Sequence, residues 1–94
     1  MYIRIARDCY VEKKRIYLYI AYNSQRSPAA LVNLVKKKRE EGKTLDVTMG
    51  KKLRTVIFLD TGELLLSGTS YKTIHQRIIG NPAVKTGANP KKGA

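Results

Sequence analysis

The 94-residue chain suits one compact domain with a single core and is too short for a second large lobe. Its 19 Lys and Arg against 7 Asp and Glu give a formal net charge of +12, which favours a polyanionic partner that would neutralise the repulsion. One cysteine, Cys9, and one histidine, His75, exclude an intramolecular disulfide and a Cys/His zinc cluster.

The first part of the chain predicts two strands. Residues 2–6 alternate weakly between apolar and polar side chains, which is typical of a short strand, and a turn at residues 7–8 follows it. Residues 15–22 are rich in β-branched and aromatic side chains and predict a longer strand. Since successive strand residues face opposite ways, we expect Ile16, Leu18 and Ile20 on one face and Tyr17 and Tyr19 on the other.

A helix is predicted over residues 28–41. Ser27 can accept hydrogen bonds from free backbone N–H groups at the helix start, and Pro28 suits the first helical position because it has no N–H to lose. Gly42 supplies a left-handed residue that ends the helix. Helical spacing predicts a buried stripe made by Leu31, Leu34 and Val35.

The second half of the chain predicts three strands and another helix. Residues 44–48 form a short strand, and residues 54–60 and 63–68 form two strand-like runs joined by a Thr61-Gly62 hairpin turn. Ser70 is the expected N-cap of a helix over residues 71–79. The buried face of that helix carries Ile74 and Ile78, with Tyr71 as a further candidate.

This order of elements predicts an α+β domain, in which a small, mostly antiparallel sheet of about five strands carries two helices on one side. Both faces of the central strands are apolar, so we expect the face without helices to be buried between subunits. The alternative is that one chain covers both faces. We assign residues 1–79 to a single domain and residues 80–94, rich in Asn, Pro, Gly and Lys, to a basic flexible tail.

Four basic clusters lie along the chain, and loop 50–54 is the best candidate for phosphate binding. There, Gly50 permits a tight backbone that presents N–H groups together with the charges of Lys51 and Lys52, and Arg54 follows. The helical run 36–39 spreads its charges around the helix, which favours a solvated surface. The pair 91–92 in the tail adds non-specific attraction.

The cluster at residues 13–15 is the second candidate for phosphate binding. Arg15 offers a planar fork that can bind phosphate oxygens through two hydrogen bonds, and Lys13 and Lys14 support it with charge. A charge at a strand edge that discourages aggregation explains Arg15 equally well. Composition alone leaves both interpretations open.

Residues typical of catalysis do not group in the sequence. Residues 49–52 lack the first Gly and the hydroxyl residue of a nucleotide-binding loop. Neither His75 nor Cys9 has a partner for nucleophilic chemistry, and turns and local ion pairs account for the acidic residues Asp46, Asp60 and Glu63. We therefore expect no enzyme activity, no cofactor, no metal ion and no small-molecule substrate.

The sequence also bears on location. We expect a cytoplasmic protein without a membrane partner, because no leader pattern opens the chain and no apolar run approaches the ~20 residues that cross a bilayer. The chain has no Trp of the kind that anchors basic amphipathic helices at membrane surfaces.

The middle of the chain carries a pattern in a fixed order. Ser27-Pro28 opens the helix, Gly42-x-x-Leu45-Asp46-x-Thr48-x-Gly50-Lys51-Lys52-x-Arg54-x-Val56 follows, and Asp60, Leu65-Leu66-Ser67 and Thr73-Ile74-x-x-Arg77-Ile78 complete it. This pattern resembles the RemA family of bacterial extracellular-matrix regulators, small DNA-binding transcription factors of biofilm-forming bacteria.

The resemblance implies a fold similar to the LytTR DNA-binding domain, assembled as a homo-oligomer in closed rings that bind and bend double-stranded DNA on a basic outer surface. In the family, an Arg early in the second strand and a pair of Arg in the Gly-containing loop bind DNA. By motif these positions are Arg15, Lys51 and Lys52, with Arg54 as a further basic position. The family's Gly-rich opening is replaced here by residues 5–10.

Two alternatives remain open. A small basic α+β domain also suits an RNA-binding or ribosome-associated protein, with Tyr17 and Tyr19 as a platform for base stacking. The second alternative is a structural oligomer whose charge maintains solubility; it predicts no affinity for nucleic acid at physiological salt.

Overall fold

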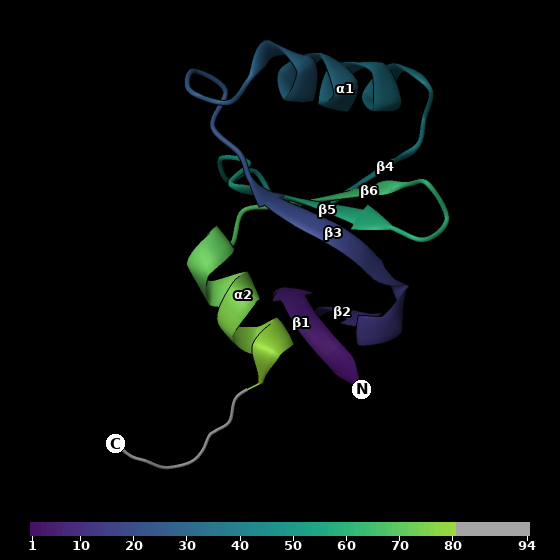
Figure 1. Ribbon diagram of the computed structural model, residues 1–94, viewed down its shortest axis with the longest axis vertical. Helices are drawn as coiled ribbons and strands as arrows, with labels where there is room; N and C mark the ends of the chain where they lie inside the picture. Colours follow the sequence, from purple (N-terminus) through teal and green to yellow (C-terminus); the bar gives the residue numbers. More distant parts are fainter. Residues whose placement is uncertain (81–94) are drawn as a thin grey trace.

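The computed structural model describes residues 1–80 of the chain. Six strands, two α-helices and one short 3-10 helix follow one another in this part of the chain (Figure 1). In order they are β1 (Tyr2–Ala6), β2 (Cys9–Glu12), η1 (Lys13–Arg15), β3 (Ile16–Ala21), α1 (Ala29–Glu40), β4 (Thr44–Asp46), β5 (Thr55–Leu59), β6 (Leu64–Ser67) and α2 (Tyr71–Ile79).

The strands form two sheets. A two-stranded sheet pairs β1 with β2, and a four-stranded sheet has the order β3-β5-β6-β4. Three pairings are antiparallel and the β4–β6 pairing is parallel, so the prediction of a mostly antiparallel α+β fold is confirmed. The prediction of a single sheet is wrong, because β2, which the sequence pattern does not indicate, pairs with β1 as a separate hairpin.

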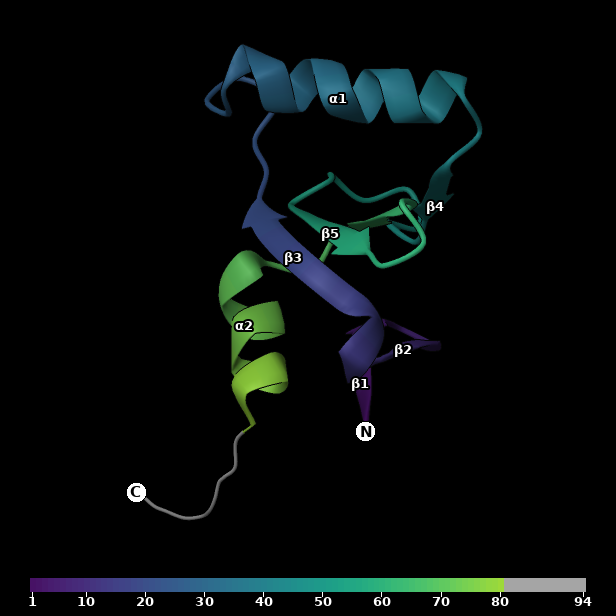
Figure 2. The same cartoon turned by 45° about the vertical axis from the view of Figure 1, so that its right-hand side comes forward.

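The two helices lie on opposite sides of the four-stranded sheet, α1 above it and α2 with the β1–β2 hairpin below it (Figures 1 and 2). On one face, Val35 of α1 packs with the sheet residues Val56, Leu64 and Leu66. On the other face, α2 and β1 cover the sheet, and the buried cluster there consists of Ile3, Ile5, Ile57, Leu65, Ile74 and Ile78.

The expectation of helices on one side and a subunit-covered face on the other is therefore wrong. Val56 and Ile57, neighbours that face opposite ways, both have 0% of their surface exposed within one chain. Apolar residues on both faces of a strand have the same pattern whether a helix or another subunit covers them, so the sequence alone did not separate the alternatives.

A β-bulge at Tyr17 changes which residues of β3 share a face. Ile16 lies opposite Leu59, whereas Leu18 lies opposite Phe58, so Tyr17 has no partner in the register. Ile16 and Tyr19 consequently both pack against the α2-side cluster. The predicted alternation along β3 is wrong, since an extra residue reverses the order of faces from that point on.

The helix ends match the sequence prediction in part. Ser70 caps α2, because its side-chain oxygen accepts a hydrogen bond from the backbone N–H of Thr73. Ser27 does not cap α1: its hydroxyl accepts a hydrogen bond from the N–H of Asn23, and Pro28 occupies the cap position itself. Gly42 follows α1 with φ +70°, the left-handed conformation expected of a residue that ends a helix.

Within residues 1–80, no helix combines the length and the apolar character that crossing a membrane requires. The β5–β6 hairpin forms across Thr61-Gly62, as predicted, with the N–H of Leu59 donating to the carbonyl of Glu63 at 3.0 Å. Of the predicted tail at 80–94, residues 81–94 lie outside the described part of the chain.

Candidate functional site

Asp46, the last residue of β4, fixes the backbone of the loop that follows the strand. Oδ1 of Asp46 accepts hydrogen bonds from the N–H of Thr48 at 2.9 Å and from its hydroxyl at 2.7 Å. These two bonds, the hydroxyl bond first, hold the pKa of the Asp46 carboxyl below its ordinary value, and the positive charge of Arg39 adds to this effect. The carboxylate therefore serves the turn, as the sequence indicates for the acidic residues.

A tight turn then presents Lys51. The N–H of Lys51 donates to the carbonyl of Thr48 at 3.0 Å, and the two residues between them have positive φ, +55° at Met49 and +81° at Gly50. Two consecutive positive φ values are typical of a type I′ turn, in which glycine is favoured at the second central position. Met49 adopts this conformation at a cost, because its Cβ crowds the backbone there.

Arg54 is held by backbone hydrogen bonds on both sides. Its N–H donates to the carbonyl of Ser67 at 2.9 Å, and its carbonyl accepts from the N–H of Tyr22 at 2.9 Å. The residue thus extends the β5 ladder toward both neighbouring strands, while its side chain is exposed. The backbone position from which the Arg54 side chain extends is therefore fixed.

Gly68 lies directly beneath the loop. A Cβ atom at this position would come within 3.1 Å of the Cβ of Lys51 and 3.3 Å of the carbonyl oxygen of Lys52. Both distances are shorter than ordinary van der Waals contact, so a side chain here would require the neighbouring atoms to shift by a few tenths of an ångström. The absence of a side chain at Gly68 lets the loop settle against the end of β6.

Lys51 and Arg54 line a common pocket of about 500 Å³ together with Arg7. Ser70, the N-cap of α2, and Thr73, in the first turn of that helix, line the same pocket. Arg7 follows β1, and sequence reasoning did not select it. Its position depends on contacts between distant parts of the chain, which local patterns do not contain.

Lys52 lies on the other side of Arg54. It lines a separate pocket of about 390 Å³ with Arg54, Tyr22 and Tyr71. Arg54 and Ser70 belong to both pockets, so these residues form the boundary between them. The structure therefore brings Lys51, Lys52 and Arg54 together as one basic surface, divided into two pockets by Arg54 and Ser70.

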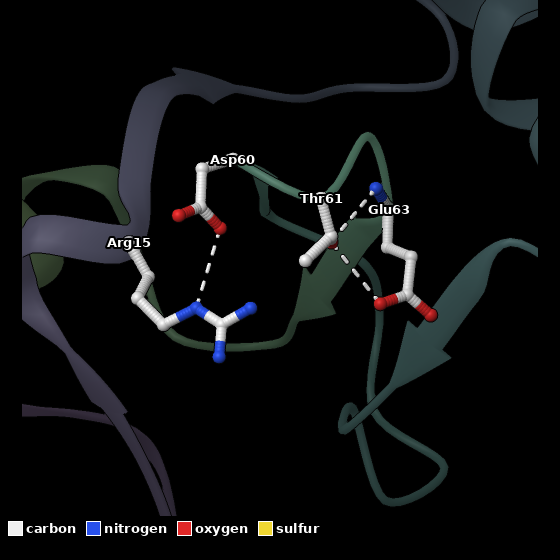
Figure 3. A network of polar contacts seen from close by, with 4 residues as sticks. All are labelled: Arg15, Asp60, Thr61 and Glu63. Carbon is white, nitrogen blue, oxygen red and sulfur yellow. Dashed lines mark hydrogen bonds and ion pairs between the residues drawn. The ribbon is translucent and has the colours of Figure 1, made fainter.

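Arg15 lies at the opposite end of the sheet. Figure 3 shows its side chain reaching toward Asp60, and its Nε donates to Oδ1 of that residue at 3.2 Å. Asp60 lies six positions after Arg54 in the chain, which at ~3.3 Å per residue corresponds to about 20 Å. Within one subunit, Arg15 and loop 50–54 are therefore too far apart to form a single binding site.

The surroundings of Arg15 also differ from those expected. Lys13, Lys14 and Arg15 form the 3-10 helix η1 and are all exposed, so Arg15 precedes β3 rather than opening it. On α1, Lys36, Lys37 and Arg39 are exposed and Lys38 is half-buried, an arrangement typical of a solvated helix surface.

Tyr19 packs with other aromatic rings, whereas Tyr17 is exposed to solvent. The hydroxyl of Tyr19 lies 2.7 Å from Nδ1 of His75, and the rings of Tyr71 and His75 are stacked with centroids 5.7 Å apart. Burial, and then the neighbouring Tyr71, raise the pKa of the Tyr19 phenol. Tyr17 is 80% exposed at the bulge. The two tyrosines expected to form one stacking platform therefore occupy different environments.

Comparison with known proteins gives a match over residues 2–78 to the family described as extracellular matrix regulatory protein A-like. A protein of Geobacillus sp. strain WCH70, provisionally named a regulatory protein, is 29% identical over 80 residues, which cover 85% of this chain and 87% of that protein. A second relative with the same kind of name, from Syntrophobacter fumaroxidans, is 34% identical over 61 residues, covering 63% of this chain and 65% of the relative.

A third similar protein, from Fervidobacterium nodosum, is also provisionally named a regulatory protein. It is 39% identical over 51 residues, and the match spans 54% of this chain and 55% of that protein. The chain thus matches about half the length of this relative and most of the length of the Geobacillus protein.

Proposed function

Because the chain belongs to the extracellular matrix regulatory protein A-like family, we propose that it is a transcriptional regulator that binds double-stranded DNA through the phosphate backbone. The names of its relatives support a regulatory role. The proposal goes further in naming DNA as the partner, and in assigning the control of genes for biofilm matrix to this protein. It includes neither catalysis nor a cofactor.

The observation that carries the proposal is the basic surface made by Lys51, Lys52 and Arg54. All three side chains are exposed, and the backbone that holds them is tied to neighbouring strands and to a tight turn. A backbone that is already held in place loses little conformational freedom on binding, which suits contact with a regular array of phosphates. Such contacts carry little sequence information, so DNA bendability would supply the specificity.

We further propose a LytTR-like fold and a closed homo-oligomeric ring. One subunit presents two separate basic regions, the loop at one end of the sheet and Lys13, Lys14 and Arg15 at the other. A ring repeats both regions at regular intervals, so that many weak phosphate contacts act together and raise the affinity. This assembly gives Arg15 a role in DNA binding although it lies about 20 Å from the loop along the strand.

Fluorescence-anisotropy binding to duplex DNA over a salt series tests the proposal. The wild type should lose affinity with a slope of about −0.9 per neutralised phosphate in a plot of log affinity against log salt. The Lys51→Ala/Lys52→Ala variant should lose binding at about 0.15 M salt, where exposed charges are screened beyond roughly 8 Å. Light scattering should give both proteins the same mass.

The matched control is Lys36→Ala/Lys37→Ala, which removes the same charge from the exposed surface of α1. This variant should bind nearly as well as the wild type. Equal losses in the two variants would assign binding to net charge rather than to the loop. A wild type that does not bind duplex DNA at all under these conditions would overturn the proposed function.

The second candidate function is RNA binding, which the 80% exposure of Tyr17 favours, since an exposed ring can stack on an unpaired base. Competition between duplex DNA and structured RNA separates the two candidates. Preference for RNA, with a loss of affinity in Tyr17→Ala, would favour this second function.

A further inference from the structure

We propose that Arg7 is a third phosphate-binding residue, which acts with Lys51 and Arg54 on one phosphate group in the 500 Å³ pocket. The inference rests on the proposed function for its partner, the DNA backbone. It adds a residue from the N-terminal hairpin to a site otherwise built from the segment between β4 and β5.

The fold carries Arg7 to the pocket through a break in the β1–β2 pairing. Arg4 lies opposite Tyr10 and Ala6 lies opposite Cys9, so Ile5 has no partner in the register. The carbonyl of Ile5 instead accepts a hydrogen bond from the buried hydroxyl of Ser67 at 2.9 Å. This bond directs the end of β1 toward the end of β6, next to the basic loop.

The residues on either side of Arg7 restrict its backbone. Ala6 is buried, with 8% of its surface exposed. Asp8 has φ +63°, a left-handed conformation that reverses the chain into β2. Arg7 is thus held between a packed strand end and a tight turn, with its side chain exposed to solvent. A bulge followed by a turn is a common way to aim one side chain at a site.

The pocket has an excess of positive charge. Within residues 1–80 there are two ion pairs, one between the N-terminal amine and Glu12 and the other between Arg15 and Asp60, and neither involves the pocket. Three cationic side chains therefore line one pocket without a carboxylate bridging them in that part of the chain. An anion bound between them relieves their mutual repulsion.

The geometry favours a phosphate over a carboxylate. Arg7 and Arg54 belong to separate segments of the pocket lining, and each guanidinium can donate two parallel hydrogen bonds, whereas Lys51 contributes a point charge. Two forks and an ammonium group match a tetrahedral anion with several acceptor oxygens. The hydroxyl residues Ser70 and Thr73 on the same lining add polar surface.

The test compares Arg7→Ala, Arg7→Lys and a matched control, Arg4→Ala, by DNA-binding anisotropy over a salt series. Arg4 lies on the same hairpin, is exposed, and lines a different pocket. Arg7→Ala should weaken binding about tenfold, as expected for loss of a charge-assisted hydrogen bond. Its salt slope should fall by about 0.9 for each subunit that contacts the DNA. Arg7→Lys should keep the slope and lose part of the affinity, and Arg4→Ala should match the wild type.

A titration with inorganic phosphate, followed through the NMR signals of the arginine Nε–H groups, separates this inference from the proposed function. If the wild type binds DNA and Arg7→Ala behaves like Arg4→Ala, the inference is wrong while the function stands. If DNA does not bind but phosphate shifts the Arg7 and Arg54 signals, and Arg7→Ala abolishes the shift at Arg54, the function fails and the pocket remains a phosphate site. Absence of both responses overturns both.

Discussion

The hydroxyl of Ser67 donates a hydrogen bond of 2.9 Å to the carbonyl oxygen of Ile5, which joins two residues that are 62 positions apart in the chain. This bond is buried, and the same hydroxyl oxygen accepts a hydrogen bond from the N–H of Thr69 at 3.0 Å, so removal of the hydroxyl takes one partner from each of two backbone groups. We expect Ser67→Ala to lower the free energy of unfolding by about 1–3 kcal/mol. Urea unfolding measures this loss, and Ser24→Ala, in an exposed loop, is the control.

The same substitution should affect DNA binding, because the Ser67 bond holds the end of β1 beside the basic loop. We expect Ser67→Ala to weaken binding in the same direction as Arg7→Ala under conditions where the protein is folded. Full affinity in a folded Ser67→Ala protein would show that the position of Arg7 does not depend on this bond.

Two glycines should separate stability from binding. Gly68→Ala places a methyl group within 3.1 Å of the Lys51 Cβ and should therefore displace the loop and reduce DNA affinity several-fold. Gly62→Ala meets no atom within 4 Å but has φ +90°, so it should cost about 1–2 kcal/mol of stability and leave affinity unchanged. Anisotropy and urea unfolding on both variants check the contrast. Equal affinities in the two variants would contradict it.

The ion pair between Arg15 and Asp60 predicts a gain of function. Both side chains are about half exposed, at 49% and 55%, so Asp60→Asn should change the free energy of unfolding by less than about 1 kcal/mol. The substitution frees the Arg15 guanidinium and raises the net charge by one. We expect tighter DNA binding and a steeper salt slope. The control compares Arg15→Ala/Asp60→Asn with Arg15→Ala, which differ by the same single charge, and an equal gain in that pair would come from net charge alone.

The lowered pKa of Asp46 predicts how the stability of the fold depends on pH. Its folded-state pKa lies below the ordinary value of 3.8, so the ionised carboxylate stabilises the fold above that pH. This contribution disappears as the pH falls through the folded-state pKa. Urea midpoints between pH 6 and pH 3 should therefore fall less steeply for Asp46→Ala than for the wild type. Thr48→Val, which removes the strongest cause of the shift, should behave likewise. Parallel curves for all three proteins would be evidence against this role.

Local signals in the sequence predicted the elements that depend on neighbouring residues. The hairpin at Thr61-Gly62 and helix α2 with its Ser70 cap match the structure, because their turn chemistry and capping bonds involve residues within a few positions of one another. Ser27 failed as a cap although it has the right chemistry. Its hydroxyl accepts the Asn23 N–H in the preceding loop, and two local motifs competed for it.

Local sequence patterns did not predict the arrangements that depend on contacts between residues far apart in the chain. The bulge at Tyr17, the pairing of β2 with β1 and the position of α1 and α2 on opposite faces all depend on contacts across the chain. For the candidate site, the composition of loop 50–54 predicted cations that the structure does bring together. It did not predict Arg7, which lines the same pocket as Lys51 although the two residues are 44 positions apart in the chain.

We expect the bulge in β3 to affect how this protein behaves at high concentration. β3 and β4 are the two outer strands of the four-stranded sheet, and unprotected outer strands are templates for cross-β aggregation. The extra residue at Tyr17 interrupts the regular spacing of hydrogen-bonding groups along β3, and β4 offers a stretch of three residues from Thr44 to Asp46. A strand from another molecule finds no long, regular edge to extend. We therefore expect the four-stranded sheet to resist fibril growth through its edges.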